Sequence, residues 1–475
     1  MIGHQNSSEP VWFLKIALIA GVLLALLTPP MCTPDENAHY MNAYSISCGD
    51  FFPEVVDGQI GRYVSTKVLA FKNKYTGKYT GKFDIGYSFG AAYFDSWLPN
   101  KDGSETFYAS SLTTISPIGY LVSGSGMAVG MYVGNLFEPE VNGLPYNLML
   151  YGRFANLIYY ITVIYWALRI TPHYKKTMLI IASMPMSIFL GASLNYDAVL
   201  IPTTILLIAV ILRLIDEEYE RVRYSDAAMV LLCTFVLVGV KLAYAPFLIL
   251  LLAVPKKKYG GQRQLYIYII LVIVTAILAY IPSLISNSIG SKVVDDYAEI
   301  VAAQHTYIRE NWFLLPKIFL TTLRMYRGFY LEGFWGKLGQ IDTNFPVPLL
   351  VSFYAVLLFV AVCDSCSVNI WKTGGWKRIL PALGFCISLC GIFFQMYSSW
   401  TAKVVEVGAQ YVSGVQGRYL IPLFLPFLLC LSNNIVGRIR IQKHMADLST
   451  HLAKGCAAIC GVLSVLIIYA RYWNI

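Results

Sequence analysis

Three side chains that can exchange protons or bind a hydroxyl group lie close together early in the chain, namely Asp35, Glu36 and His39. Asp35 and His39 are four residues apart, so they would share one face of a helix. A carboxylate at such a position can accept the proton of a substrate hydroxyl. The alternative is structural, because Thr33, Pro34 and Glu36 would also supply an N-cap, an N1 proline and a capping box. The spacing alone leaves both interpretations open.

Other charged or strongly polar residues lie within or beside apolar segments, where they are costly and often functional. Arginine binds phosphate through paired, charge-assisted hydrogen bonds, so Arg153 and Arg418, with Lys241, are candidates to bind an anionic group. Each could instead form a structural ion pair or reach the membrane surface. The neighbouring polar candidates for substrate contact are Asn156, Asn195, Asp197, Gln416 and Tyr419.

The elements that must position these residues are membrane helices. Hydrophobic residues make up 57% and charged residues 13% of the 475 residues, against roughly 45–50% and about 25% in ordinary globular domains. Apolar runs long enough to span a bilayer recur along the chain. This composition excludes a soluble enzyme, a disordered chain and a disulfide scaffold. It predicts a single all-α polytopic membrane domain over residues 1–475, with its first apolar run retained as a helix.

About eleven spans are expected, at 12–30, 146–170, 177–194, 198–215, 226–242, 243–254, 265–285, 347–363, 380–398, 419–433 and 455–471. Basic clusters fall in alternate loops between them. If the N-terminus is cytoplasmic, all five clusters are on the inner side, as the positive-inside rule requires, and the C-terminus is outside. The clusters are Lys175-Lys176, Arg221 with Arg223, Lys256-Lys257-Lys258 with Arg263, Lys372 with Lys377-Arg378, and Arg438 with Arg440 and Lys443.

This topology gives the outer side two large loops, at 31–145 and 286–346. Residues 113–137 are long enough to span, but crossing would invert everything downstream, so we expect an interfacial or re-entrant helix there. The repeat Tyr75-Thr-Gly-Lys78 and Tyr79-Thr-Gly-Lys82 predicts a turn or hairpin in the first loop. Its lysines belong to a basic patch that is either simply solvated or docks an anionic polymer or lipid head group.

The net charge of +9 follows from the basic loop clusters, so nucleic acid is not an expected partner. No metal site is expected. His39 and His305 are isolated, and adjacent acids such as Asp295-Asp296 seldom bind a cation without further oxygen ligands. The lone pair Cys363 and Cys366 lacks the two further ligands of a zinc site. No cofactor is expected either.

Six motifs occur together and carry a resemblance. In chain order they are Pro34-Asp35-Glu36-x-x-His39-x-x-x-Ala43-Tyr44, Arg153-x-x-Asn156, Met184-Pro185 through Ser193-Leu-Asn-Tyr-Asp197, Gly336-Lys-Leu-Gly-Gln-Ile-Asp342, Tyr397-x-x-Trp400 and Gly414-Val-Gln-Gly-Arg418-Tyr419-x-x-Pro422. Over nearly its whole length the chain resembles a bacterial family of predicted polytopic membrane proteins filed as a domain of unknown function. Gln340 departs from that pattern, because the family tends to carry an aromatic residue there.

That family looks like the GT-C superfamily of membrane glycosyltransferases, by analogy at the level of the fold. The resemblance implies a polyprenyl-phosphate sugar as donor, Asp35 as catalytic base, and Glu36 or His39 as the residue that orients the acceptor. The donor phosphate would bind Arg153, Arg418 and Lys241. The expected acceptor is a cell-envelope glycan at the outer face of the bacterial cytoplasmic membrane, with inversion at the anomeric carbon. The motifs add Asp342 and Trp400 to the substrate-binding candidates.

Two alternatives remain open at this point. One is a transporter or flippase for lipid-linked envelope intermediates, which would also need a cationic outer cavity. Such a protein would need neither a carboxylate fixed beside the first helix nor two large loops on one side. The other is a polysaccharide polymerase, an enzyme with a similar arrangement of outer loops.

Overall fold

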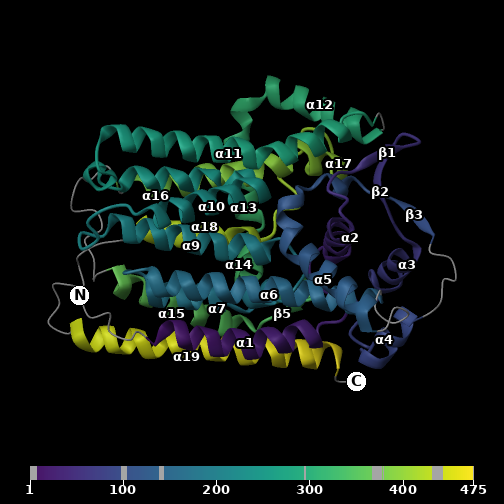
Figure 1. Cartoon of the computed structure of the whole chain (residues 1–475), viewed down its shortest axis with the longest axis horizontal. Helices are drawn as coiled ribbons and strands as arrows, with labels where there is room; N and C mark the ends of the chain where they lie inside the picture. The colour runs from purple at the N-terminus through teal and green to yellow at the C-terminus, as the bar shows by residue number, and fades with distance from the viewer. Residues whose placement is uncertain are drawn as a thin grey trace.

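The fold is a bundle of long helices with a region of shorter helices and strands at one end (Figure 1). The computed structural model describes residues 8–97, 104–137, 144–293, 296–365, 377, 379–430 and 442–473. The helices of the bundle are α1 (Glu9–Leu27), α6 (Pro145–Ile170), α7 (Lys175–Ser183), α8 (Pro185–Gly191), α9 (Asp197–Ile215), α10 (Tyr224–Val240), η3 (Leu242–Ala253), α11 (Gln262–Gly290), α15 (Val347–Ser365), α16 (Ile379–Gln395), α18 (Ile421–Cys430) and α19 (Gln442–Tyr472).

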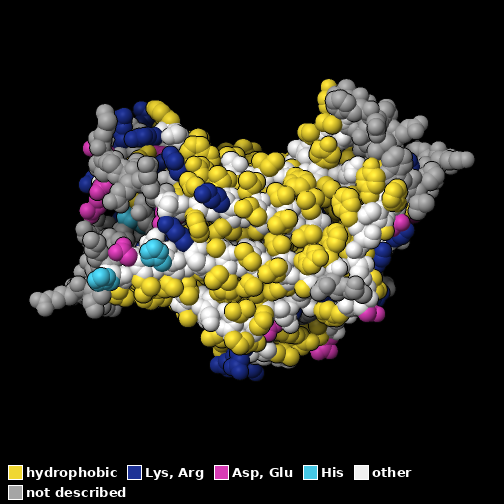
Figure 2. Space-filling view, turned by 90° about the horizontal axis from the view of Figure 1, so that it is seen from below, with side chains coloured by type: hydrophobic (Ala, Val, Ile, Leu, Met, Phe, Trp, Pro, Cys, Tyr) yellow, Lys and Arg dark blue, Asp and Glu magenta, His cyan; other side chains and the backbone are white. Residues whose placement is uncertain are grey.

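The bundle carries the surface of a membrane protein. Figure 2 shows a broad band of hydrophobic side chains between two ends where most of the charged residues gather. Six helices are long and apolar enough to cross a membrane, namely α1, α9, α11, α15, α16 with the turns that follow it, and α19. Helix α9 is almost wholly enclosed by the others, whereas α11 is the most exposed of the six. A helix that is apolar all round belongs either inside a protein or in a membrane.

Two sequence predictions about these elements need correction. The segment 177–194, expected to be one span, is divided into α7 and α8 at Pro185, because proline has no N–H to continue the helix. The description all-α was also too strict, since two small antiparallel sheets are present. Each of the eleven segments contains helix, but the number of membrane crossings stays a prediction.

The first and last helices of the bundle lie side by side and run in the same direction. Ser8, just before α1, accepts a hydrogen bond from Lys454, and the Leu27 carbonyl accepts one from Trp473. Helix α1 therefore begins and α19 ends at opposite ends of the bundle, as Figure 1 shows. This arrangement agrees with an odd number of crossings.

The basic loops gather where α1 begins. Lys176 forms an ion pair with Asp364 at 3.2 Å and donates a hydrogen bond to Ser449. Lys258 donates to the carbonyls of Leu214 and Asp216, so the loops around α9, α10 and α11 also meet there. Lys372, Arg378, Arg438 and Arg440, with the side chain of Lys443, lie outside the described residues.

The opposite end holds the elements of the first large loop. They are α2 (Glu36–Ser47), β1 (Glu54–Val56), β2 (Gln59–Ser65), α3 (Thr66–Tyr75), α4 (Phe89–Trp97), β3 (Glu105–Ala109), η1 (Ser111–Thr114), η2 (Pro117–Tyr120) and α5 (Leu121–Phe137). Strand β2 pairs antiparallel with both β1 and β3. Lys78 and Lys82 donate backbone hydrogen bonds to Tyr75 and Tyr79, so the predicted repeat forms two successive turns.

Helix α5, expected to be interfacial or re-entrant, packs on α2 and on the first turns of α6. A methyl group at Gly124 would touch Ile46 of α2, and one at Gly126 would lie 2.6 Å from the Tyr151 carbonyl of α6. Its position relative to the membrane stays a prediction. The second large loop forms α12 (Asp296–Glu310), η5 (Trp312–Leu314), α13 (Leu315–Met325), α14 (Arg327–Trp335), β4 (Lys337–Leu338) and β5 (Thr343–Asn344).

Candidate functional site

The candidate site is centred on Arg418, which lies in η8 (Gly417–Leu420) directly before α18 and is buried. Its Nη2 donates to Asp35 Oδ2 at 2.7 Å, and its Nε donates to Gln416 Oε1 at 2.7 Å. Its Nη1 lies 3.3 Å from Asp197 Oδ2. Arg418 Nη1 and Asp197 Oδ2 are both buried, and neither has a hydrogen-bond partner among the described residues. Arg418 thus joins its own segment to those of Asp35 and Asp197, and its buried Nη1 faces the Asp197 carboxylate.

Gly417 explains how the chain places Arg418. A methyl group at Gly417 would lie 2.4 Å from the Tyr330 carbonyl oxygen and 2.5 Å from the Phe334 nitrogen. The backbone of η8 therefore rests directly on the backbone of α14, and any side chain would force the two apart. Gly417 belongs to the Gly414–Pro422 motif, but its role could not be inferred from spacing. The signal was a glycine between the polar candidates Gln416 and Arg418.

Asp35 is the N-cap of α2 and has a left-handed backbone, with φ 57°. Its side chain is 52% exposed, although its partner Arg418 is only 2% exposed. The prediction of an N-cap at Thr33 is wrong, because α2 begins at Glu36 and the Thr33 hydroxyl is buried with no described partner. The capping-box role of Glu36 is also wrong, since its carboxylate binds Arg153. Asp35 is therefore the acid of this motif that faces solvent.

Asn195 connects the segments that carry the two acids. Its Nδ2 donates to the Pro34 carbonyl at 3.2 Å, and its Oδ1 accepts the backbone N–H of Asp197 at 2.9 Å. The side chain is fully buried. Asn195 therefore fixes the residue before Asp35 against the first turn of α9. It was predicted to bind substrate, and the structure places it behind the acids.

Lys241 supplies a second cation. It is the C-cap of α10, and its Nζ lies 3.8 Å from the centre of the Tyr419 ring. The Tyr244 hydroxyl donates to the main-chain carbonyl of Tyr419 at 2.9 Å and so fixes the backbone that carries this ring. Among the described residues Lys241 has no carboxylate within ion-pair distance of 4.0 Å. Its charge is balanced only by the ring face and the more distant acids, so it can attract an anion.

His39 lies under Asp35 in an aromatic setting. Its Nδ1 is 2.8 Å from the Tyr120 hydroxyl, and its ring packs edge-on against Tyr196. Burial lowers the pKa of His39 to about 3, because a charged imidazolium is poorly solvated there. His39 is therefore neutral at physiological pH, and it supports the Asp35 turn. Tyr120 and Tyr196 were missed by sequence analysis, which gave no signal to separate them from core tyrosines.

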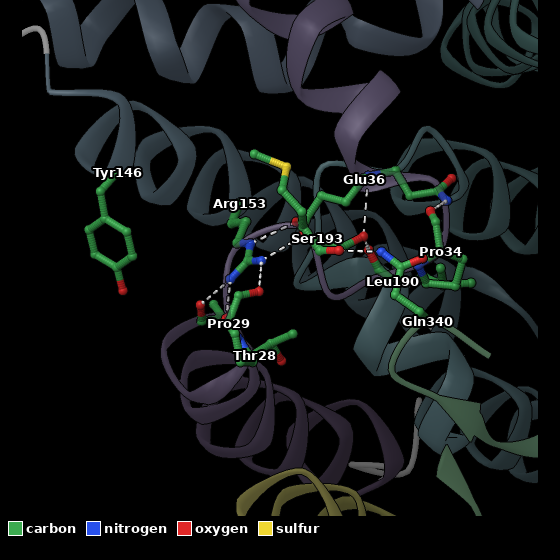
Figure 3. A network of polar contacts seen from close by, with 12 residues as sticks. Thr28, Pro29, Pro34, Glu36, Tyr146, Arg153, Leu190, Ser193 and Gln340 are labelled. Atoms are coloured by element: carbon green, nitrogen blue, oxygen red, sulfur yellow. Dashed lines mark hydrogen bonds and ion pairs between the residues drawn. The ribbon is translucent and has the colours of Figure 1, made fainter. Parts of the chain in front are cut away.

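Arg153 and Glu36 form a second ion pair (Figure 3). Two hydrogen bonds of 2.7 and 2.8 Å join their side chains, and both are fully buried. The other Arg153 donors reach the carbonyls of Ala25, Thr28 and Pro29 at the end of α1. These bonds use the full donor capacity of the guanidinium. Arg153 therefore has no donor left for a phosphate, and it fixes α2 to α1 and α6.

Asn156, on the same helix as Arg153, also makes a buried structural contact, because its Nδ2 donates to the Ser193 carbonyl at 2.8 Å. Asp342 lies apart from Arg418 in the tip between β4 and β5. Its Oδ2 accepts the Gly81 N–H at 2.9 Å and lies 3.3 Å from Arg471 Nη2. Asp342 thus ties the two large loops to the end of α19. Asp342 was predicted to bind substrate, and these contacts favour a structural role.

Trp400 packs behind Gly414, where a methyl group would lie 2.4 Å from its ring. Gly414 is two residues before Gln416, so Trp400 reaches this segment through its contact with the glycine. The π-helical turn η7 (Met396–Thr401) places it there. Trp400 therefore borders the segment that precedes Arg418.

The sequence predicted no metal site, and part of the residues concerned lies within the described ranges. Within the described ranges, no three His, Cys, Asp or Glu side chains converge as metal ligands. Asp295 and Cys366 lie outside the described residues, and so does the side chain of Asp296, the first residue of α12. The charged site itself consists of two cations and two carboxylates.

The helical bundle, its apolar band and its six long apolar helices define a multi-pass membrane protein. A family model described as a predicted membrane protein, DUF2142, matches residues 18–427, and the chain belongs to that family. The match includes all the candidate residues of the Arg418 site. No curated protein and no solved structure gives a match.

Proposed function

We propose that this protein is a GT-C-like membrane glycosyltransferase with about eleven spans. It would move a sugar from a polyprenyl-phosphate donor to a cell-envelope glycan at the outer face of the bacterial cytoplasmic membrane. Asp35 is the catalytic base, and Arg418 with Lys241 binds the donor phosphate. The reaction is a single displacement that inverts the anomeric carbon.

The observation that carries the proposal is the unequal exposure of one ion pair. The Asp35 carboxylate is open to solvent, while its partner Arg418 is buried and keeps Nη1 free of hydrogen bonds among the described residues. A base must reach its substrate, and a phosphate-binding guanidinium acts most strongly away from bulk water. Lys241 adds a second positive charge at the Tyr419 ring, which both cations contact.

The charges also suggest the order of events. Arg418 and Lys241 balance Asp35 and Asp197 in the resting site. The acceptor hydroxyl attacks the anomeric carbon, and its proton passes to the Asp35 carboxylate. The bond from the anomeric carbon to the phosphate oxygen breaks, and its electron pair stays on the leaving polyprenyl phosphate. Because protonation neutralises Asp35, Arg418 is then freed to hold the phosphate, whose negative charge has increased.

The remaining candidates take positioning roles in this proposal. Arg153, Glu36 and Asn156 fix the buried layer below α2. Asn195 holds the turn before Asp35, and Gln416 orients the Arg418 guanidinium through Nε. Loss of such groups would misplace the reacting residues rather than remove them, and small misplacements are costly in catalysis.

The proposed orientation, with the N-terminus inside, rests on the separation of charges along the bundle. The described basic loops lie at the end where α1 begins. Asp35 and α2 lie beyond the other end of α1, with the elements of the first large loop. A cytoplasmic basic end puts Asp35 outside, where lipid-linked sugars are the available donors.

The test is genetic and chemical. A strain lacking the protein is complemented with the wild type, with Asp35→Asn, or with Asp84→Asn as a matched control on an exposed first-loop acid. We expect Asp35→Asn to reproduce the altered envelope glycans of the deletion and Asp84→Asn to restore the normal ones. Normal glycans with Asp35→Asn would contradict the proposed base.

A second arm separates transfer from transport. Detergent-solubilised protein is incubated with labelled polyprenyl-phosphate sugars and an envelope glycan extract from the deletion strain. A glycosyltransferase releases polyprenyl phosphate without any membrane to cross, whereas a flippase does not. Absence of release with every donor and extract tested would favour the transporter.

A further inference from the structure

An open cleft of about 220 Å³ lies beside the Arg418 site. Three aromatic residues from the junction of α13 and α14 line one wall, namely Tyr326, Phe329 and Tyr330. Ile341 and the segment 412–416 also line the cleft. Gln416 therefore borders the cleft and also accepts the hydrogen bond from Arg418 Nε. The cleft and the guanidinium are separated by one side chain.

The lining of this cleft is largely apolar, although it adjoins a cationic site. Its lining includes tyrosine, phenylalanine, valine and isoleucine residues. Flanking the aromatic wall, Met325 is 60% exposed and Leu331 is 54% exposed. In a membrane protein, such exposed apolar side chains belong in contact with lipid. The cleft thus has exposed apolar residues next to it in the sequence, and through Gln416 it adjoins Arg418.

We infer that this cleft holds the first isoprenoid units of a polyprenyl phosphate whose phosphate contacts Arg418. The ligand has the complementary chemistry, with an anionic head and a branched apolar chain. The volume lies below the roughly 300–1,000 Å³ of a pocket that encloses a whole ligand. Only the proximal part of the chain fits, and the remainder stays in the bilayer. This inference rests on the proposed function, because it takes the donor phosphate as the group that Arg418 holds.

The backbone around the cleft is specialised for this place. Ile341 has a left-handed backbone with φ 62°, which is costly for a β-branched residue. Its neighbour Gln340 donates a hydrogen bond to the Met31 carbonyl, four residues before Asp35. A chain that occupies the cleft therefore contacts a loop that is joined to the segment carrying the base. Strained backbone of this kind is often found at ligand clamps.

The experiment uses the full-length protein in nanodiscs and measures binding of a long-chain polyprenyl phosphate, a ten-carbon isoprenyl phosphate and inorganic phosphate. The variants are Tyr326→Ala and Phe329→Ala. The matched control is Phe94→Ala, an exposed phenylalanine of α4 outside the cleft. We expect both cleft variants to weaken both isoprenyl phosphates by about tenfold, which corresponds to about 1.4 kcal/mol. Inorganic phosphate binding should be unchanged, and Phe94→Ala should behave as the wild type.

A second measurement keeps the inference testable if a cleft variant fails to fold. Wild-type protein is irradiated with a polyprenyl phosphate that carries a diazirine on its first isoprene unit. We expect the label on residues 326–330 or 412–416. Label confined to other segments, or unchanged lipid affinity in folded cleft variants, would overturn the inference. Protection of the cleft by a free hexose but not by lipid phosphate would also overturn it, and would make the cleft a sugar site.

These outcomes are distinct from those of the proposed function. A protein that binds and labels through the cleft but transfers no sugar would retain the inference and lose the glycosyltransferase proposal. Sugar transfer by a protein whose label lies elsewhere would retain the glycosyltransferase proposal and reject the lipid-binding cleft.

Discussion

Two arginine–carboxylate pairs begin from adjacent residues, and their surroundings differ. Glu36 pairs with Arg153 where both side chains are fully buried and every guanidinium donor has a partner. Asp35 pairs with Arg418 at the same 2.7 Å distance, but its carboxylate is half exposed and one donor is unsatisfied. The first pair is complete without a ligand, whereas the second is not. Charge and distance alone would not separate them.

The comparison predicts its largest effect in the buried pair. Arg153→Ala should lower the free energy of unfolding by about 3–5 kcal/mol, because it leaves Glu36 charged and without its partner in the interior. Thermal unfolding in detergent measures the loss. Arg169→Ala on the same helix is exposed and serves as the matched control, with an expected change below about 1 kcal/mol. Equal stability of Arg153→Ala and Arg169→Ala would contradict the structural role.

In the exposed pair, Asp35→Asn should act on the reaction rather than on folding. We expect a loss of about 10²–10⁴-fold in sugar transfer, since a general base contributes about that factor. Stability should fall by less than in Arg153→Ala, because Asp35 is half exposed and the buried Arg418 keeps Asp197 at 3.3 Å. Turnover per folded molecule and the unfolding temperature are measured on the same preparation. Wild-type turnover in folded Asp35→Asn would remove Asp35 from catalysis.

Substitutions of Arg418 sharpen the comparison by separating charge from geometry. Arg418→Lys keeps the charge but loses the planar fork, so we expect partial activity. Arg418→Ala should lose about 10²–10³-fold in turnover, as when a transition-state donor is removed. Because Arg418 is buried, activity must be scaled to folded protein, and the donor KM measured with it. If residual activity simply followed the amount of folded protein, Arg418 would belong with Arg153.

The smallest effect concerns pH and the residue beneath Asp35. His39 has a pKa of about 3 in the folded protein and about 6.5 when unfolded. Between these values the unfolded chain binds more protons, so stability falls as the pH falls from about 6.5 towards 3. The slope from this group is at most about 1.4 kcal/mol per pH unit. His39→Gln should remove that part of the slope, as measured by unfolding between pH 5 and 7. An identical slope in the two proteins would show that His39 is not buried as the structure places it.

The sequence by itself determined the class of this protein and most of the residues that matter. Long apolar runs predict membrane helices, because a helix satisfies its own backbone N–H and C=O groups where the bilayer offers no water. The cost of a charge in such a run also marked Arg153, Arg418 and Lys241. It predicted that these groups have partners, but composition and spacing could not say which ones.

Only the tertiary structure assigned the partners. Asp35 has a left-handed backbone just before α2, whereas Glu36 is the first residue of that helix, so the two neighbouring side chains diverge. One faces η8 and the other faces α6. The capping pattern predicted an N-cap at Thr33 with Glu36 in a capping box. Glu36 is instead buried, and a buried carboxylate needs a cation, which Arg153 supplies. The cleft is likewise non-local, since its walls come from residues 326–341 and 412–416. No local pattern encodes which distant segments meet, and that meeting decides which arginine can bind a ligand.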